Sequence, residues 1–139
     1  MAKKISDLMS PNPYAIDADK AVAHAARMMT DEDVGLAPIV EGDRLVGALT
    51  DRDIVTRVVA EGRDPQSVAV REVASTGLVT IGPQQDLDEA LQLMASNKIR
   101  RLPVVEQDGR LVGVVAQADI AREAKEQQTG ALVEEISQP

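Results

Sequence analysis

Apolar residues recur with helical spacing in two segments that lie 65 residues apart, at 22–29 and 87–94. In both segments apolar side chains stand at i, i+3, i+4 and i+7, which places four of them on one helix face. We therefore predict two amphipathic helices. Aspartates that precede them, Asp19 and Asp86, stand where N-caps are expected.

Continuous apolar runs follow each predicted helix and indicate β-strands. Apolar and polar residues alternate little within these runs, which is typical of strands covered on both faces. Asp108-Gly109 lies between the last two runs and is a hairpin signal. A short strand is expected before each helix, and a further helix is expected to begin near Asp51 and near Gln117. The predicted strands lie at 14–16, 37–40, 45–49, 78–81, 102–105 and 111–115.

These elements recur because the sequence repeats itself. Residues 5–54 align with residues 70–120 at an offset of 65, which becomes 66 after one extra residue in a turn, and Arg-Leu-Val-Gly occurs in both copies. We predict a first repeat, a linker, a second repeat and a tail, at 1–62, 63–69, 70–126 and 127–139. The tail is compatible with a short helix or with disorder, and we assign it no function.

Composition excludes several functions. Lys and Arg number 15 against 23 Asp and Glu, a net charge of −8, and Tyr14 is the only aromatic residue. Nucleic-acid binding needs basic contacts and stacking faces, and anionic membranes repel an acidic surface. The absence of cysteine removes disulfides and thiolate zinc sites. With no apolar run near the roughly 18 residues of a membrane span and no secretory signal, we expect a cytoplasmic protein.

Candidate chemistry concentrates where a predicted strand meets a helix. Gly47 lets a ligand or a neighbouring backbone approach closely. Thr50 stands at the expected N-cap and Asp53 three residues later, so both side chains leave the same helix end. A carboxylate can accept two hydrogen bonds from the vicinal diol of a ribose. Thr-x-x-Asp is equally the pattern of a capping box, which needs no ligand, and both interpretations stay open.

The pattern Gly-apolar-apolar-Thr-x-x-Asp, in tandem with Ala-Pro-Ile-Val (37–40) and Leu-Pro-Val-Val (102–105), resembles a cystathionine-β-synthase (CBS) domain pair, or Bateman module. The resemblance covers residues 5–125 and extends to small stand-alone pairs of the hypoxic-response type. It implies an α/β (α+β) fold of two β-α-β-β-α repeats packed with pseudo-twofold symmetry. It also implies a disc-shaped homodimer and regulatory binding of AMP, ADP, ATP, NAD(H) or S-adenosylmethionine between the repeats.

The resemblance further implies roles for individual residues. Thr50 and Asp53 would hold the ribose, and Arg100 and Arg101 of the other copy would meet the phosphates, which suit guanidinium forks. Neighbouring strand residues point to opposite faces, so one arginine could equally be a solvated surface charge. An apolar pocket for adenine is expected from Ile16, Ala37 and Pro38.

The second copy departs from this pattern. It keeps Asp119 but has Ala116 in place of the threonine, and its partner segment at 34–38 lacks a basic residue. We therefore expect one competent site, with the second weak or empty. Because the second copy keeps Asp119, the question of whether its site binds a ligand stays open.

The expected function is that of a sensor that binds an adenine nucleotide and changes conformation or affinity for a regulated protein. No phosphate-cradling loop, nucleophile with a base or metal cluster indicates an enzyme. The lone His24 is expected at the surface, and Met28, Met29 and Met94 in the core. The alternative is a dimerisation or adaptor domain whose nucleotide site is vestigial.

Overall fold

The computed structural model of the 139-residue chain describes residues 3–11, 13–123 and 125. The chain divides into two compact units. The N-terminal unit comprises Asn12–Leu78 and Val105–Leu111, and the C-terminal unit comprises Met1–Pro11, Val79–Val104 and Val112–Pro139. The tail predicted at 127–139 lies outside the described residues.

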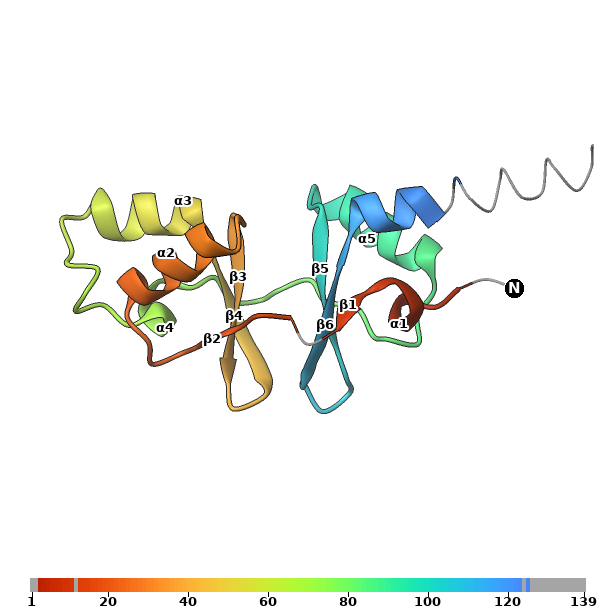
Figure 1. The fold of residues 1–139 in the computed structure, drawn as a ribbon, viewed down its shortest axis with the longest axis horizontal. Helices are drawn as coiled ribbons and strands as arrows, with labels where there is room; N and C mark the ends of the chain where they lie inside the picture. Colours follow the sequence, from red (N-terminus) through yellow and green to blue (C-terminus); the bar gives the residue numbers. More distant parts are fainter. Residues whose placement is uncertain (1–2, 12, 124, 126–139) are drawn as a thin grey trace, which may run out of the picture. The chain divides into compact units, whose positions relative to one another are not determined.

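The N-terminal unit is a three-stranded sheet with helices beside it (Figure 1). The strand order is β2-β3-β4, with β2 parallel and β4 antiparallel to β3. Gly42, at φ 64°, supplies the left-handed conformation that the tight β3–β4 turn requires. The elements are β2 (Ile16–Asp17), α2 (Val22–Asp31), β3 (Leu36–Glu41), β4 (Arg44–Thr50), α3 (Asp51–Ile54), the π-helical turn η1 (Val55–Val59) and α4 (Val70–Val73).

The C-terminal unit also has a three-stranded sheet, of order β1-β6-β5, in which β1 pairs antiparallel with β6. Residues 117–123 continue from β6 in helical conformation, as α3 continues from β4. The mixed α/β class expected from the sequence is confirmed in both units. The elements are α1 (Ile5–Leu8), β1 (Ser10–Pro11), α5 (Leu87–Asn97), β5 (Arg101–Val105) and β6 (Leu111–Ala116).

Most of the predicted elements are confirmed, and three details are wrong. The strand expected at 14–16 forms at Ile16–Asp17, and within 78–81 the pairing is a single bridge from Ile81 to Val104. Asp86 caps α5 by accepting a hydrogen bond from the Glu89 amide, at 2.9 Å. Asp19 caps nothing, because α2 begins two residues further on, after Ala21.

The first segment of each repeat packs on the other repeat. In the N-terminal unit, the amides of Val70 and Arg71 donate to the carbonyls of Lys20 and Ala18, at 2.8 and 3.1 Å. In the C-terminal unit the corresponding pairs are Ile5 with Gln85 and Ser6 with Pro83, both at 2.9 Å. The two sequence repeats therefore exchange their opening segments between the compact units. The boundaries 1–62 and 70–126 remain a prediction about the sequence repeat.

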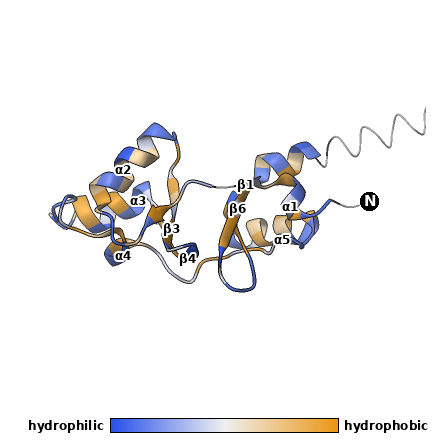
Figure 2. Cartoon of the chain, turned by 60° about the horizontal axis from the view of Figure 1, so that its bottom comes forward, coloured by the Kyte–Doolittle hydropathy of each residue, from blue (hydrophilic) through white to orange (hydrophobic). Residues whose placement is uncertain are grey.

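Side chains from the exchanged segments complete the core of each unit. Ile5 of α1 is fully buried against residues of the second repeat, and Val70 and Val73 of α4 are buried against the first. Figure 2 shows β3 and β6 mainly in the hydrophobic colour and the helices with hydrophobic and hydrophilic residues intermixed. As expected, Met29 and Met94 are buried and His24 is exposed, whereas Met28 is half-buried and packs against the core from outside. Among the described residues, no helix is long and apolar enough to cross a membrane.

Polar contacts also hold α4 in place. The Glu72 carboxylate accepts a hydrogen bond from the Ala69 amide at 2.8 Å, and this bond lowers the pKa of Glu72 below its usual value. Arg71 forms an ion pair with Asp19 at 2.6 Å. The Asp19 side chain therefore contacts α4 and does not cap α2. These exposed contacts orient a segment whose main anchors are backbone hydrogen bonds.

Both long helices end in a left-handed residue that is not glycine. Asp33 follows α2 with φ 53°, and Lys98 caps α5 with φ 55°. These two residues are repeat equivalents, 65 positions apart. The fold therefore imposes the same strained conformation at the same point of each copy.

Two equivalent glycines permit close approach of the exchanged segments. A Cβ on Gly47 would lie 3.0 Å from the Ser75 carbonyl oxygen, and one on Gly113 would lie 3.0 Å from the Ser10 carbonyl oxygen. On Gly113 it would also lie 2.5 Å from the sulfur of Met9. Of the two possibilities for Gly47, the structure thus shows the approach of a neighbouring backbone.

We predict that Gly113→Ala lowers the free energy of unfolding by about 1–3 kcal/mol, because the added methyl group forces β6 and β1 apart. Urea denaturation followed by circular dichroism measures the change. Gly82→Ala is the matched control, since its Cβ would meet only the flexible end of Gln85, at 3.3 Å. Equal stability of the two variants would contradict the close-approach explanation.

Candidate functional site

The candidate site begins where β4 ends and α3 starts. Thr50 is extended, with φ −109° and ψ 161°, and its Oγ1 accepts the Asp53 amide at 3.0 Å. In return, the Thr50 amide donates to Asp53 Oδ2, also at 3.0 Å. The capping box predicted from Thr-x-x-Asp is therefore confirmed. The ribose role of the same two side chains stays a prediction.

Two residues that the sequence did not indicate surround the Asp53 carboxylate. Asp53 is only 9% exposed. The Ser75 hydroxyl donates to its Oδ2 at 3.4 Å, and the Arg57 Nε lies 3.8 Å from its Oδ1. Arg57 also donates to the Val73 carbonyl at 3.1 Å, so both residues connect the carboxylate to the end of α4. The spacing of four residues between Asp53 and Arg57 is a usable sequence signal, whereas Ser75 has none.

One oxygen of Asp53 remains available. Asp53 Oδ1 accepts no hydrogen bond from the described residues and has only the longer ion-pair contact with Arg57. Across the described part of the chain, every buried side-chain nitrogen or oxygen has a hydrogen-bond partner. Oδ1 is therefore open to solvent and can accept a hydrogen bond from a ligand.

The three residues expected to hold adenine lie in the interior of the N-terminal unit. Ile16 is 1% exposed and Ala37 0% exposed, and both belong to its core cluster. Pro38 is also buried, within β3. Their side chains serve core packing here, and contact with a ligand remains a prediction.

Arg100 and Arg101 belong to the C-terminal unit and are both exposed. Arg101 is the first residue of β5, and the Arg100 carbonyl accepts the Gln117 amide at 2.7 Å. Their guanidinium groups have the exposure that a phosphate contact needs. Their participation in one site with Asp53 stays a prediction.

The second copy places different groups around its aspartate. Asp119 Oδ1 accepts from Arg122 at 2.7 Å, and Glu123 stands where the first copy has Arg57. Glu123 is buried and pairs with Lys3 at 3.0 Å. Ala116 at the end of β6 has no hydroxyl to form a capping box. A hollow of about 270 Å³ lies here, lined by Asp7, Leu8, Ser10, Asp119, Arg122 and Glu123.

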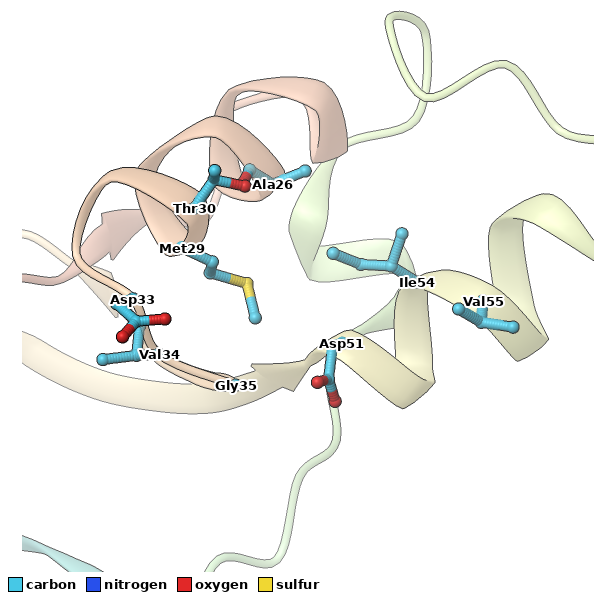
Figure 3. A pocket seen from close by; sticks show the side chains of 9 residues that line it. All are labelled: Ala26, Met29, Thr30, Asp33, Val34, Gly35, Asp51, Ile54 and Val55. Carbon is cyan, nitrogen blue, oxygen red and sulfur yellow. The ribbon is translucent and has the colours of Figure 1, made fainter.

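A larger pocket of about 560 Å³ lies between α2 and α3 of the N-terminal unit (Figure 3). Met29 extends into it from α2, and Ile54 and Val55 approach from the other side. Asp33 and Asp51 lie at its polar rim, while the remaining lining is mostly apolar. Thr50 and Asp53 do not line this pocket, so it is separate from the capping-box site.

Comparison with known proteins identifies the family. A sequence model of the CBS domain matches residues 5–60 and again residues 70–126. The chain belongs to the CBS domain family. The match covers both copies, which confirms the resemblance inferred from the paired motifs.

Relatives of similar length match most of the chain. The CBS domain-containing protein YhcV of Bacillus subtilis is 44% identical over 117 residues, covering 84% of this chain and 82% of YhcV. Hypoxic response protein 1 of Mycobacterium tuberculosis is 35% identical over 134 residues, covering 96% and 93%. A crystal structure of Hypoxic Response Protein I with two coordinated zinc ions superposes with a TM-score of 0.79 at 36% identity, covering 86% of this chain and 98% of that one.

A structure of CBSX2 in complex with AMP has a TM-score of 0.76 at 22% identity, covering 90% of this chain and 98% of CBSX2, and shows the common fold. Zinc sites are built mainly from Cys and His. This CBS chain has no cysteine and one histidine, and its described residues contain no group of three or more His, Cys, Asp or Glu able to hold a metal ion. The residues present do not fit zinc.

We predict that Thr50→Ala lowers the free energy of unfolding by about 1 kcal/mol, because the Asp53 amide loses its acceptor. Thermal denaturation by calorimetry measures the loss. Thr50→Ser keeps the hydroxyl and should retain most of the stability. If both variants lose the same amount, the threonine methyl rather than the capping hydrogen bond stabilises the helix start.

Proposed function

We propose that this CBS pair is a regulatory module that binds an adenine nucleotide such as AMP, ADP or ATP. The observation that carries the proposal is the geometry at the β4–α3 junction, where a nearly buried Asp53 presents one open carboxylate oxygen beside the Thr50 hydroxyl. An oriented carboxylate next to a hydroxyl suits the two vicinal hydroxyl groups of a ribose. The ligand range extends to NAD(H) and S-adenosylmethionine, which share the adenosine group.

The family supports the chemical class of ligand. CBS pairs are generally regulatory modules rather than enzymes, and CBSX2, which shares the fold, was crystallised with AMP. In this chain Arg100 and Arg101 supply exposed guanidinium groups for the phosphates. A local cluster of cations is needed because the chain as a whole carries a charge of −8.

We infer one competent site, with the first copy as its sugar-binding half. The first copy has Thr50 and the open Oδ1 of Asp53. In the second copy, Arg122 already occupies Asp119 at 2.7 Å, and Ala116 offers no hydroxyl. A ribose there would share the carboxylate with Arg122 and would find no hydroxyl in the place of Thr50, so it would gain fewer hydrogen bonds.

We predict that AMP, ADP, ATP, NADH or S-adenosylmethionine raises the unfolding midpoint of the wild-type protein. A ligand at 100 times its dissociation constant adds about 2.7 kcal/mol to the folded state, which corresponds to several degrees. Asp53→Ala should abolish this ligand-induced shift, and the equivalent variant Asp119→Ala should preserve it. Differential scanning calorimetry with and without each ligand gives the shift separately from the lower basal stability of the capping variant.

A shift that survives in Asp53→Ala and disappears in Asp119→Ala would move the site to the second copy. The absence of any shift would favour the alternative, a dimerisation or adaptor domain with a vestigial site. The completed capping box is what supports that alternative, since Thr50 and Asp53 already have a structural use. Capture of a regulated protein would then be the next experiment.

We also propose that the chain forms a homodimer through the η1 face of its N-terminal unit. Val55 is 57% exposed and Val59 65% exposed, and Val55 continues into the apolar lining of the 560 Å³ pocket. Contiguous apolar surface marks association sites, and we assign the dimer contact to these two valines together with the apolar pocket lining. A twofold dimer would cover this face on both copies at once.

We predict that the combined change Val55→Lys and Val59→Lys weakens the dimer at least tenfold, because two charges would have to be buried. Sedimentation velocity over a concentration series measures the association. Val46→Lys is the control, since Val46 is also exposed, at 40%, but lies on β4. A wild-type chain that stays monomeric at about 100 µM, or a dimer insensitive to the double change, would contradict this interface.

A further inference from the structure

The hydroxyl of Ser75 stands beside the proposed sugar-binding carboxylate without being part of the Thr-x-x-Asp motif. Ser75 Oγ donates to Asp53 Oδ2 at 3.4 Å. The same oxygen atom of Asp53 accepts the Thr50 amide at 3.0 Å, so Oδ2 is engaged on two sides. The carboxylate is thereby oriented with its Oδ1 left for another donor.

The backbone of Ser75 is fixed by a two-way pairing with β4. The Ala48 amide donates to the Ser75 carbonyl at 3.0 Å, and the Ser75 amide donates to the Ala48 carbonyl at 2.8 Å. Gly47 allows this approach because a side chain there would crowd the Ser75 carbonyl. The backbone that carries this hydroxyl is therefore held by the sheet and is not part of a free loop.

The Thr50 hydroxyl, the Ser75 hydroxyl and the Asp53 carboxylate can each form a further hydrogen bond. Thr50 Oγ1 accepts the Asp53 amide, and its own proton has no acceptor among the described residues. Ser75 Oγ uses its proton on Asp53 and keeps lone pairs for a further donor. Together with Asp53 Oδ1, the cluster offers one donor and two acceptors. Two adjacent ligand hydroxyls, each able to donate and accept, match this set.

We propose that Ser75 is a specificity-determining residue of the nucleotide site, with its Oγ accepting one hydroxyl of the ribose while Asp53 Oδ1 accepts the other. This assignment rests on the proposed function and adds to it a selection for ribonucleotides over deoxyribonucleotides. A site built to bond a sugar hydroxyl discriminates against an analogue that lacks it, because its polar groups are then left unpaired.

The test is isothermal titration calorimetry of the full-length protein with AMP, 2′-deoxy-AMP and 3′-deoxy-AMP. We expect the wild-type protein to bind AMP at least tenfold more tightly than one of the deoxy analogues. Ser75→Ala should weaken AMP binding by about five- to tenfold, the value of one hydrogen bond. The same variant should bind that deoxy analogue as tightly as the wild type does. The ratio of AMP affinity to deoxy-analogue affinity should therefore fall in the variant.

Controls separate recognition from structure. Ser75→Thr keeps a hydroxyl and should keep the ratio, as should Ser10→Ala, which changes the equivalent serine of the other unit. A Ser75→Ala protein that loses affinity for all three nucleotides equally, or for none, would overturn the role of Ser75 while leaving nucleotide binding in place. A wild-type protein that binds none of the three would overturn the role of Ser75 in AMP recognition, and the unfolding midpoints with ADP, ATP, NADH and S-adenosylmethionine would decide the proposed function separately.

Discussion

The structure depends on the backbone hydrogen bonds that attach the opening segment of each repeat to the other repeat. The Val70 amide reaches the Lys20 carbonyl, and the Ile5 amide reaches the Gln85 carbonyl, at 2.8 and 2.9 Å. Because of these bonds, α4 and α1 complete cores that a repeat of about 50 residues could not complete alone. They also bring Ser75 against β4 and thus next to Asp53. A sequence break between the repeats is therefore not a break between folding units.

Local features of the fold were predictable from the sequence, and features that depend on the exchange were not. Apolar spacing located α2 and α5, and Thr-x-x-Asp located a capping box, because such patterns act within a few residues. The spacing of Asp19 suggested a helix cap. Its carboxylate instead accepts a hydrogen bond from Arg71, 52 positions later in the sequence. Ser75 lies 22 residues from Asp53. Ser75 and Asp53 come together only when the α4 segment packs on the first repeat, and no local sequence pattern predicts that contact.

The two copies share a backbone frame but differ in the chemistry placed on it. The bridge between Ala48 and Ser75 has its equivalent in the pairing of Val114 with Ser10, and Gly47 and Gly113 allow the same approach in both. Around the aspartates, however, Arg57 is replaced by Glu123 and Thr50 by Ala116. Main-chain hydrogen bonds tolerate these changes because they do not depend on side-chain identity. One frame thus carries a capping box around a buried carboxylate in one copy and an exposed ion pair on the equivalent aspartate in the other.

The left-handed residues that end the two long helices bear on how the protein could adapt to heat. A residue other than glycine in this conformation costs about 1 kcal/mol, and less for aspartate, whose short side chain can hydrogen-bond locally, so Lys98 carries a larger cost than Asp33. Neither position requires an aspartate or a lysine for the turn itself, since glycine or asparagine adopts it more readily. The chain therefore retains a reserve of stability that two surface substitutions could release, and a variant with glycine or asparagine at both positions would withstand a higher temperature with its core unchanged.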